Sequence, residues 1–434
     1  MADLVAWAER FVATPSESRL GNAAIADVAG ELLCELGLMA GEVESVHVGG
    51  TLHHALICDV GHGEADDALL LVTHLDTVPP GDSAAWTETG GNPFRATRDG
   101  DRLYGLGSAD AKVDFICKAT ALAAERESLA RRVRLVGTFG EEIGMLGARW
   151  LVETGLTKGH SRALVGEPSE LAVIHAHKGY AVYEARVRLE RVTSSAGGPR
   201  VDAQVVRGAA AHSSDPALGK NAILGALELL ASSGARTVSA LSGGGAAVNV
   251  VPERCEIAFE PAWSAEPLVA FLRAWRALEE SLRAREDSRF SPAHSVVSLG
   301  RVGLADGCAV FGFDVRPIPG ADAAALVAPL ARVSELTCVR TNPALATARD
   351  SALVRELEAS QRAAGLPVRV ETKATCTEAG ILASAGLDAV VLGPGTSVGN
   401  VHKPNEHTRI SQLSQAVTLY RAALTRLAGG ARCS

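Results

Sequence analysis

The sequence predicts an α/β protein in which a mostly parallel sheet lies between helices and a second, α+β domain is inserted into the first. Three observations support this prediction. Helical patterns alternate with short apolar strands up to about residue 178, long two-faced strands dominate residues 179–342, and the first pattern returns over residues 343–434. We therefore expect one domain built from residues 1–178 and 343–434, and an inserted domain at residues 179–342.

The first part of the chain is predicted to form helices that alternate with buried strands. Apolar residues recur at helical spacing from Met1 to Leu38, and the nearly all-apolar segment Ala68–Leu75 is typical of a strand covered on both faces. This alternation favours a parallel sheet, because parallel strands need crossover connections, usually helices. The further expected elements are strands at Leu52–Val60, Arg132–Thr138 and Ser161–Val165, and helices at Lys112–Glu127 and Met145–Thr154.

The middle part has long strands that alternate between apolar and polar residues, which is typical of an antiparallel sheet with one face on a core. The expected strands are Tyr180–Leu189, Arg200–Arg207, Ala247–Phe259, Val296–Leu299, Ala309–Val315 and Glu335–Arg340, with helices at Asn221–Ser232, Pro267–Asp287 and Asp322–Ala331 and a glycine-rich turn at Ser242–Gly245. The last part is expected to contain helices at Ser351–Gly365, from Glu378 and at Ser411–Leu427, and strands at Val368–Glu371 and Ala389–Leu392.

The composition excludes several classes of partner. A hydrophobic content of 47% with 21% charged residues predicts a folded protein with a sizeable core. The formal net charge of -8 argues against nucleic acid and anionic membranes as partners, because both require a surplus of basic residues. No apolar run is long enough to cross a bilayer, and neither a signal peptide nor paired cysteine spacings are visible. We expect a cytoplasmic protein whose partner is a small molecule.

The first candidate site residues stand at the end of a predicted strand. His74 closes the strand Ala68–Leu75 and Asp76 follows two residues later, so both side chains point to the same side. His74 could bind a metal through one ring nitrogen while Asp76 accepts the other ring N–H and fixes the tautomer. A surface histidine beside a turn-capping aspartate is the simpler explanation when this short motif is taken alone.

Three further carboxylates have two interpretations each. Asp110 follows a glycine-rich turn and precedes a helix, where it could bridge two cations or could simply cap the helix. The adjacent Glu141 and Glu142 follow an apolar strand, and two neighbouring carboxylates need positive charge nearby unless they lie in a solvated acidic loop. If a metal supplies that charge, Glu142 could bind it while Glu141 faces the bound water as general base.

Two more residues complete a common pattern. Glu167 follows another apolar strand, and His402 lies in the loop that follows the strand Ala389–Leu392. Open α/β sheets bind ligands at the carboxyl ends of their strands, so all of these side chains are expected at one edge. Together they form a mixed nitrogen and oxygen set that suits two zinc ions, or cobalt, better than magnesium or a thiolate site. The expected metal ligands are His74, Asp110, Glu142, Glu167 and His402.

The chain resembles the co-catalytic zinc metallopeptidase family that includes acetylornithine deacetylase, succinyl-diaminopimelate desuccinylase, aminoacylase and glutamate carboxypeptidase. The resemblance covers nearly the whole chain, and the order of its blocks is specific. It implies a zinc-peptidase-like fold with an inserted lid and dimerisation domain, and a metal-dependent hydrolase of amide bonds. The blocks are Thr73–Pro79, Gly105–Lys112, Glu141–Glu142, Gly166–Pro168, Ala211–Ser214, Gly219–Ala222, Asn249–Pro252, Asp314–Arg316 and Val401–Glu406.

The resemblance also implies a role for each metal-site residue. Asp110 bridges the two metal ions, His74 and Glu167 complete one of them, and Glu142 and His402 complete the other. Asp76 orients His74. Glu141 takes a proton from the attacking water and returns it to the leaving amine. The peptide bond between Asp110 and Ala111 is cis in such relatives.

For the inserted domain, the residues alone predict only a surface-loop histidine and a charge at a strand end. The resemblance implies instead that His212 stabilises the oxyanion, from its own subunit or from the partner in a homodimer, and that Arg316 and Asn249 bind the substrate carboxylate. The chain departs from the family pattern here, because an extra helical stretch separates Asn249–Pro252 from Asp314–Arg316. Either the lid is enlarged or Arg316 is not the matching arginine.

The substrate is predicted from three short segments, Ala176–Gly179, Cys376–Ala379 and Leu392–Gly395, which are most similar to the acetylornithine deacetylase branch. They indicate an N-acyl amino acid with a small acyl group. Succinyl-diaminopimelate desuccinylase, another N-acyl amino acid hydrolase and a dipeptidase stay open as alternatives, and Glu378 could be a helix cap or could meet the substrate amine. A catalytically inactive ligand-binding relative is the hypothesis from another class.

Overall fold

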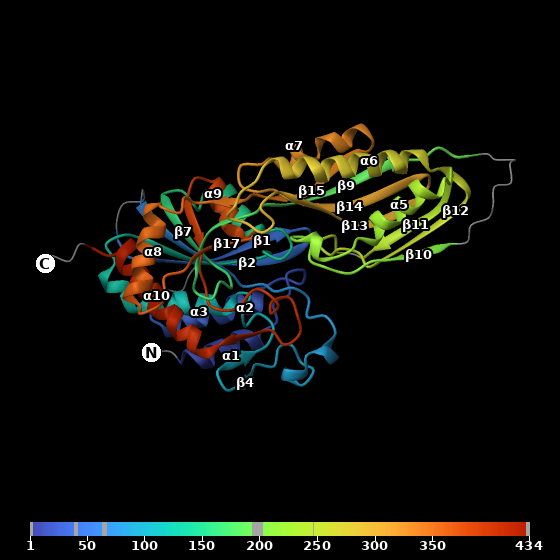
Figure 1. The fold of residues 1–434 in the computed structure, drawn as a ribbon. Coiled ribbons are helices and arrows are strands. Elements are labelled where there is room, and N and C mark those ends of the chain that lie inside the picture. The colour runs from blue at the N-terminus through green and yellow to red at the C-terminus, as the bar shows by residue number, and fades with distance from the viewer. Residues whose placement is uncertain (1–2, 39–41, 63–66, 193–202, 246, 431–434) are drawn as a thin grey trace. The chain divides into compact units, whose positions relative to one another are not determined.

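The computed structural model describes residues 3–38, 42–62, 67–192, 203–245 and 247–430, which form two compact units (Figure 1). The first unit is built from Met1–Ala176, Leu345–Thr372 and Thr377–Ser434, and the second from His177–Ala344 and Lys373–Cys376. The second unit therefore interrupts the first along the chain. Its short segment Lys373–Cys376 was expected in the last part of the first domain.

A sheet with four parallel strands at its centre organises the first unit. These strands are β6 (Val133–Thr138), β3 (Ala68–His74), β7 (His160–Gly166) and β18 (Asp388–Val391), in that order. The expected mostly parallel sheet is confirmed at the centre. On one side lie β2 (Thr51–Val60) and β1 (Glu42–Val48), and on the other β8 (Val173–His177), followed by β16 (Leu345–Ala346), with β17 (Val370–Lys373) also on β8. The flanking strands β2 and β8 run antiparallel to the centre.

The alternation of side chains along β3 explains why helices cover both faces of this sheet. Leu69 and Leu71 point into one core, and Leu70 and Val72 point into the other. The first core also takes residues from α1 (Leu4–Ala13), α2 (Ala23–Glu35), α3 (Lys112–Glu125), α8 (Ala352–Ala363) and α10 (Ile410–Leu427), and the second from α4 (Leu146–Glu153) and α9 (Glu378–Ser384). None of the described helices is both long and apolar enough to span a membrane.

The second unit is an antiparallel sheet backed by helices, as expected from its two-faced strands. Helices α5 (Ala222–Ser233) and α6 (Glu266–Ser281) pack against it, and the ring of Phe271 on α6 stacks on Phe311 of the sheet at 4.2 Å. A short helix, α7 (Ala323–Val327), precedes the last strand (Figure 1). The strand order is β10 (Gln204–Arg207), β12 (Arg254–Ser264), β11 (Thr237–Gly244), β13 (Val296–Ala305), β14 (Cys308–Arg316), β9 (Tyr180–Arg188) and β15 (Glu335–Asn342).

Some element boundaries differ from the sequence-based expectation. The glycine-rich segment Ser242–Gly245 is not only a turn, because β11 continues to Gly244, where an added Cβ atom would lie 2.0 Å from the carbonyl oxygen of Gly300. The strand expected at Ala247–Phe259 begins only at Arg254, after Pro252, which has no N–H for a ladder. The strand expected at 200–207 falls partly outside the described residues and is seen from Gln204. The exposed edge strand β1 was not expected.

Candidate active site

Three neighbouring parallel strands carry candidate residues to the same edge of the sheet. β3 ends at His74, β7 ends one residue before Glu167, and β6 is followed by Glu141 and Glu142. In the sheet register His74 lies opposite Thr138 of β6, and Thr73 lies opposite Gly166 of β7, so these strands end level with one another. Their carboxyl ends therefore place four of the expected side chains together.

Asp110 and His402 reach the same edge through a small separate sheet. In this sheet β5 (Arg102–Tyr104) pairs with β4 (Thr97–Asp99) and with β19 (His407–Arg409). The pairing holds the turn that follows β5 against the loop that precedes β19, and the Gly105 N–H donates to the carbonyl of Glu406 at 2.9 Å. Asp110 then stands at the start of α3, and its peptide bond to Ala111 is cis, as the resemblance implied.

The side chains form two groups that share Asp110. His74 Nε2 lies 3.1 Å from Asp110 Oδ1 and 3.9 Å from Glu167 Oε1. His402 Nε2 lies 3.2 Å from Asp110 Oδ2 and 2.9 Å from Glu142 Oε1. The two histidines thus face different oxygens of one carboxylate. The possible ligand atoms fall into two sets, His74 with Glu141 and Glu167, and Asp110 with Glu142 and His402, and within each set all atoms lie within 4.8 Å of one another.

The electrostatics of the two groups fit divalent cations. Burial raises the pKa of Glu141 well above its usual value, and the Glu142 and Glu167 carboxylates raise it further. Burial also raises the pKa of Glu142, against the opposing effect of the nearby His402. Carboxylates crowded in this way repel one another unless positive charge lies between them. Two divalent ions would provide that charge and would use the same imidazole and carboxylate atoms, so the donor set fits a dinuclear site.

Asp76 contacts more residues of the site than the sequence predicted. Nδ1 of His74 lies 3.0 Å from the backbone carbonyl oxygen of Asp76 and 3.7 Å from the Asp76 carboxylate. The carboxylate accepts hydrogen bonds from the Ser18 hydroxyl at 2.5 Å and from the backbone N–H groups of Glu141 and Glu142 at 3.2 and 3.4 Å. With Nδ1 protonated, Nε2 of His74 stays available for a ligand, and the same aspartate orients the two glutamates.

Two further glutamates contact this region. One of them, Glu378, was expected to cap a helix or to meet the substrate amine, and the cap interpretation is wrong, because Thr377 caps α9. Glu406 Oε1 accepts hydrogen bonds from the N–H groups of Ala109 and Asp110 at 2.9 and 3.1 Å, so it fixes the turn that presents Asp110. Glu378, at the start of α9, is fully buried and accepts a hydrogen bond from the Thr138 hydroxyl at 3.0 Å. Both residues lie in segments that the resemblance had drawn attention to, but their partners are distant in sequence.

A fully buried ion pair between Lys118 and Asp114 connects neighbouring strands of the sheet near the site. Lys118 Nζ lies within hydrogen-bond distance of four oxygens, at 2.7 Å from the Val72 carbonyl, 3.0 Å from Thr73 Oγ1, 3.2 Å from the Leu164 carbonyl and 2.8 Å from Asp114 Oδ2. The Tyr420 hydroxyl on α10 lies 2.5 Å from the other oxygen of Asp114 and 2.6 Å from the Leu392 carbonyl. One network therefore touches β3, β7 and the residue after β18. Gly166 leaves room for it, because a Cβ atom there would lie 1.9 Å from Asp114 Oδ2.

The oxyanion candidate His212 and the two substrate-binding candidates, Asn249 and Arg316, all belong to the second unit, where they lie on connected segments. Ser213, next to His212, donates its N–H to the Asn249 carbonyl at 3.0 Å, and the Ser213 hydroxyl accepts a hydrogen bond from Arg316 at 3.1 Å. The His212 ring meets the Ser214 hydroxyl at 2.7 Å. Arg316 is 4% exposed, and its guanidinium carbon lies 4.4 Å from the centre of the Tyr180 ring. The structure thus connects these residues, and the extra helix between their motifs is α6.

Comparison with known proteins agrees with this architecture. The model of peptidase family M20/M25/M40 matches residues 70–426. Acetylornithine deacetylase of Myxococcus xanthus is 29% identical over 396 residues, which span 85% of this chain and 83% of that protein. Aminoacylhistidine dipeptidase of Vibrio alginolyticus has a similar fold, with a TM-score of 0.65 at 15% identity over 96% of each chain. A dinuclear metal-binding M20 peptidase of Bacillus subtilis has a TM-score of 0.57 at 14% identity over 98% of this chain and 97% of its own.

The solved structures establish the fold, and the family model establishes kinship, because it spans more than half of the chain. This is the metallopeptidase family that the sequence was found to resemble. The chain belongs to peptidase family M20/M25/M40 and is a hydrolase that acts on amide bonds.

Proposed function

We propose that this chain removes a small acyl group from an N-acylated amino acid, in a reaction of the acetylornithine deacetylase type. The observation that carries the proposal is the cluster of two histidines and four carboxylates at the strand ends of the first unit. The name of the Myxococcus xanthus relative supports the choice of a deacetylase over a peptidase.

Two divalent metal ions are the proposed cofactors, with zinc expected first and cobalt as the alternative. Asp110 would bridge them, His74 and Glu167 would complete one, and Glu142 and His402 would complete the other. When bound, such ions polarise a carbonyl group and lower the pKa of a water molecule. The two oxygens of Asp110 that face different histidines support the bridging role.

Glu141 is the proposed general base. It would take a proton from the attacking water as the water oxygen forms a bond to the acyl carbon. It would then give this proton to the amine nitrogen as the carbon–nitrogen bond breaks, which yields a free carboxylate and a free amine. Asp76 assists by holding the backbone of Glu141, at 3.2 Å from its N–H, and by orienting His74.

The second unit is proposed to act as lid and dimerisation domain of a cytoplasmic homodimer. His212 would stabilise the oxyanion, in its own subunit or in the partner's. Arg316 would bind the substrate carboxylate with its planar guanidinium, and Asn249 would assist. The hydrogen bonds that connect these segments through Ser213 support a shared role.

A hydrolysis screen tests the proposal. The purified protein, supplied with zinc or cobalt, is assayed with N-acetylornithine, N-acetylcitrulline, N-succinyl-diaminopimelate and simple dipeptides. We expect N-acetylornithine to be hydrolysed with the highest kcat/KM. Exclusive hydrolysis of dipeptides or of the succinylated substrate would contradict the deacetylase assignment but keep the site, and no hydrolysis of any substrate by metal-loaded protein would favour a catalytically inactive relative.

A further inference from the structure

The proposed metal ligand His402 lies in an exposed loop, residues 396–406, whereas the other ligands are buried. Its side chain is 48% exposed, and the side chains of the other four proposed ligands are at most 9% exposed. The His402 ring contacts Asp110 and Glu142, but both of these are proposed metal ligands themselves. The position of the ring therefore depends on what fixes the backbone of its loop.

The backbone of this loop adopts conformations that need support from other contacts. Residues 401–404 form neither helix nor strand, and both His402 and Asn405 have a positive φ, of 58° and 64°. Residues with a Cβ atom rarely adopt this left-handed region because of steric crowding, although asparagine tolerates it better than most. Side-chain contacts on either side of His402 are therefore needed to hold it in place.

Asn400 fixes the base of the loop, before His402. Its side-chain amide donates to the carbonyls of Thr396 and His407 at 2.9 and 2.8 Å, and its side-chain oxygen accepts from the His407 N–H at 3.1 Å. These bonds join the start of the loop to the first residue of β19. They close the loop on itself and do not connect it with the segments on its outer side.

Asn405, three residues after His402, connects the loop with a segment that is distant in sequence. Its side-chain amide donates to the Thr87 hydroxyl at 2.9 Å and to the Ala85 carbonyl at 3.4 Å. Its side-chain oxygen accepts from the Glu88 N–H at 3.0 Å. Both hydrogens of the amide and its oxygen are thus used in contacts with residues 85–88.

The segment that Asn405 binds is itself firmly held. Trp86 lies between the bonded residues and is buried, and its indole N–H donates to the Pro80 carbonyl at 2.8 Å. The Trp86 carbonyl accepts from the Gly91 N–H at 2.9 Å. A buried tryptophan anchors its segment, because any displacement would expose a large apolar surface to water. Asn405 therefore joins the exposed loop to an anchored part of the first unit.

We propose that Asn405 is a positioning residue for the metal ion that His402 binds. Its three hydrogen bonds hold the loop so that the His402 imidazole faces Asp110 and Glu142. Contacts that orient a metal ligand typically change metal affinity by about 10–100-fold when they are lost. Asn405 is not a ligand and acts through His402. The inference rests on the proposed dinuclear site and adds a residue to it.

Zinc retention by the full-length, zinc-loaded protein tests this proposal in a titration with a competing chelator. Glycine adopts a positive φ without strain, so Asn405→Gly keeps the backbone conformation and removes the three hydrogen bonds. We expect this variant to bind one of its two ions about 10–100-fold more weakly and the other unchanged. If the variant retains both ions as tightly as the unmodified protein, the proposal is overturned. An unmodified protein that binds fewer than two ions would contradict the dinuclear site, and this inference with it.

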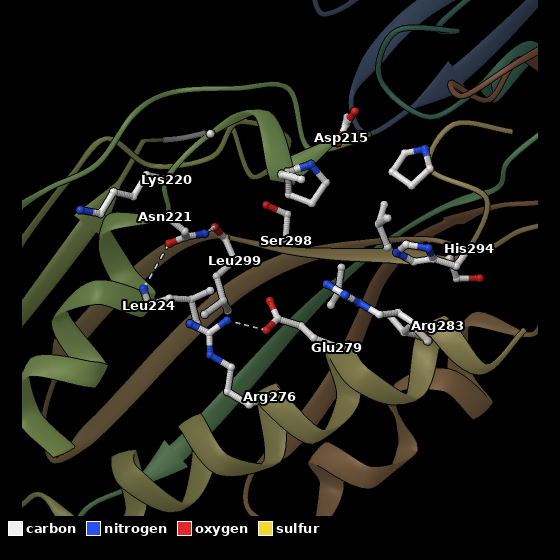
Figure 2. A pocket seen from close by; sticks show the side chains of 18 of the residues that line it. Asp215, Lys220, Asn221, Leu224, Arg276, Glu279, Arg283, His294, Ser298 and Leu299 are labelled. Carbon is white, nitrogen blue, oxygen red and sulfur yellow. Dashed lines mark hydrogen bonds and ion pairs between the residues drawn. The ribbon is translucent and has the colours of Figure 1, made fainter. Parts of the chain in front are cut away.

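Asn221→Gly is the matched control. Asn221 lines a cavity of the second unit (Figure 2), and its side chain also forms three hydrogen bonds. It donates to the Leu299 carbonyl at 2.8 Å and accepts from the N–H groups of Ile223 and Leu224 at 3.0 and 3.2 Å. All proposed metal ligands belong to the first unit, so this variant should retain both ions. Equal weakening in both variants would indicate a general loss of stability and would overturn the proposal.

A combination with His402→Ala tests whether Asn405 acts through this histidine. His402→Ala removes a proposed ligand and should itself weaken the binding of one ion. If Asn405 only positions the His402 ring, adding Asn405→Gly should weaken zinc binding no further, because the ring is already absent. Independent effects would instead multiply. Fold-changes that multiply in the double variant would therefore overturn the positioning role.

Discussion

Replacing Lys118 by methionine should strongly destabilise the first unit. Lys118 and Asp114 are 0% and 1% exposed, and their ion pair of 2.8 Å has no contact with solvent. Methionine keeps most of the side-chain volume but removes the charge, so the Asp114 carboxylate stays buried with only neutral donors around it. Breaking a buried pair by removing one partner typically costs about 3–5 kcal/mol. At about 2–4 °C for each kcal/mol in a unit of this size, the melting temperature should fall by about 6–20 °C.

Thermal unfolding followed by tryptophan fluorescence measures this loss. Arg421→Met is the matched control. Arg421 on α10 forms an ion pair with Glu125 of α3 at 2.7 Å but is half exposed, and exposed pairs contribute no more than about 1 kcal/mol. The double variant Asp114→Asn with Lys118→Met should recover much of the loss, since no uncompensated charge remains. A Lys118→Met protein that melts within about 3 °C of the unmodified protein, or a double variant whose loss is the sum of the single losses, would refute this reasoning.

Three further outcomes are expected. Glu141→Gln should lower kcat by about 10²–10⁴-fold with metal still bound, as measured by elemental analysis, and retained activity would exclude Glu141 as the base. Asp76→Ala should weaken metal affinity by about 10–100-fold in a chelator competition, because His74 and Glu141 lose their support, and unchanged affinity would contradict this. Burial raises the pKa of Asp314 to about 6, against the opposing charge of Arg316. Protonated Asp314 therefore stabilises the folded state, fully at a pH below the unfolded pKa of about 3.9. This stabilisation is lost as the pH rises through about 6. The melting temperature relative to Asp314→Asn should therefore fall between pH 4 and pH 7, and a pH-independent difference would contradict the shift.

Local patterns were sufficient to predict the strands that carry the site. Ala68–His74 is apolar because both of its faces are buried, and the polar residue at its end is conspicuous for that reason. The same holds for the strands before Glu142 and Glu167. The two-faced strands of the second unit were recognised by their alternation, and the structure confirms the antiparallel sheet that they predicted.

Contacts between distant segments were beyond such patterns. Asp76 and the Glu141 N–H that it binds are 65 residues apart in the sequence, and Glu406 and the Asp110 N–H are 296 residues apart. No periodicity encodes these pairings, which exist only once the sheet has assembled. The glycines of β11 were misjudged for a related reason, because they serve a close approach of neighbouring strands that a turn-like composition conceals.

The placement of β18 has a consequence for the order of events during synthesis. This strand completes the parallel centre of the first unit by pairing Asp388 with Arg162 and Val391 with Val165, and Tyr420 reaches Asp114 from still further along the chain. Ribosomes add about 5–20 residues per second, and domains generally fold as units. The inserted unit is therefore fully synthesised before β18, and until β18 is made the sheet of the first unit has an unpaired edge at β7. We expect the inserted unit to mature first on the ribosome, and the amide-hydrolysing unit to close only after release of the C-terminal helix.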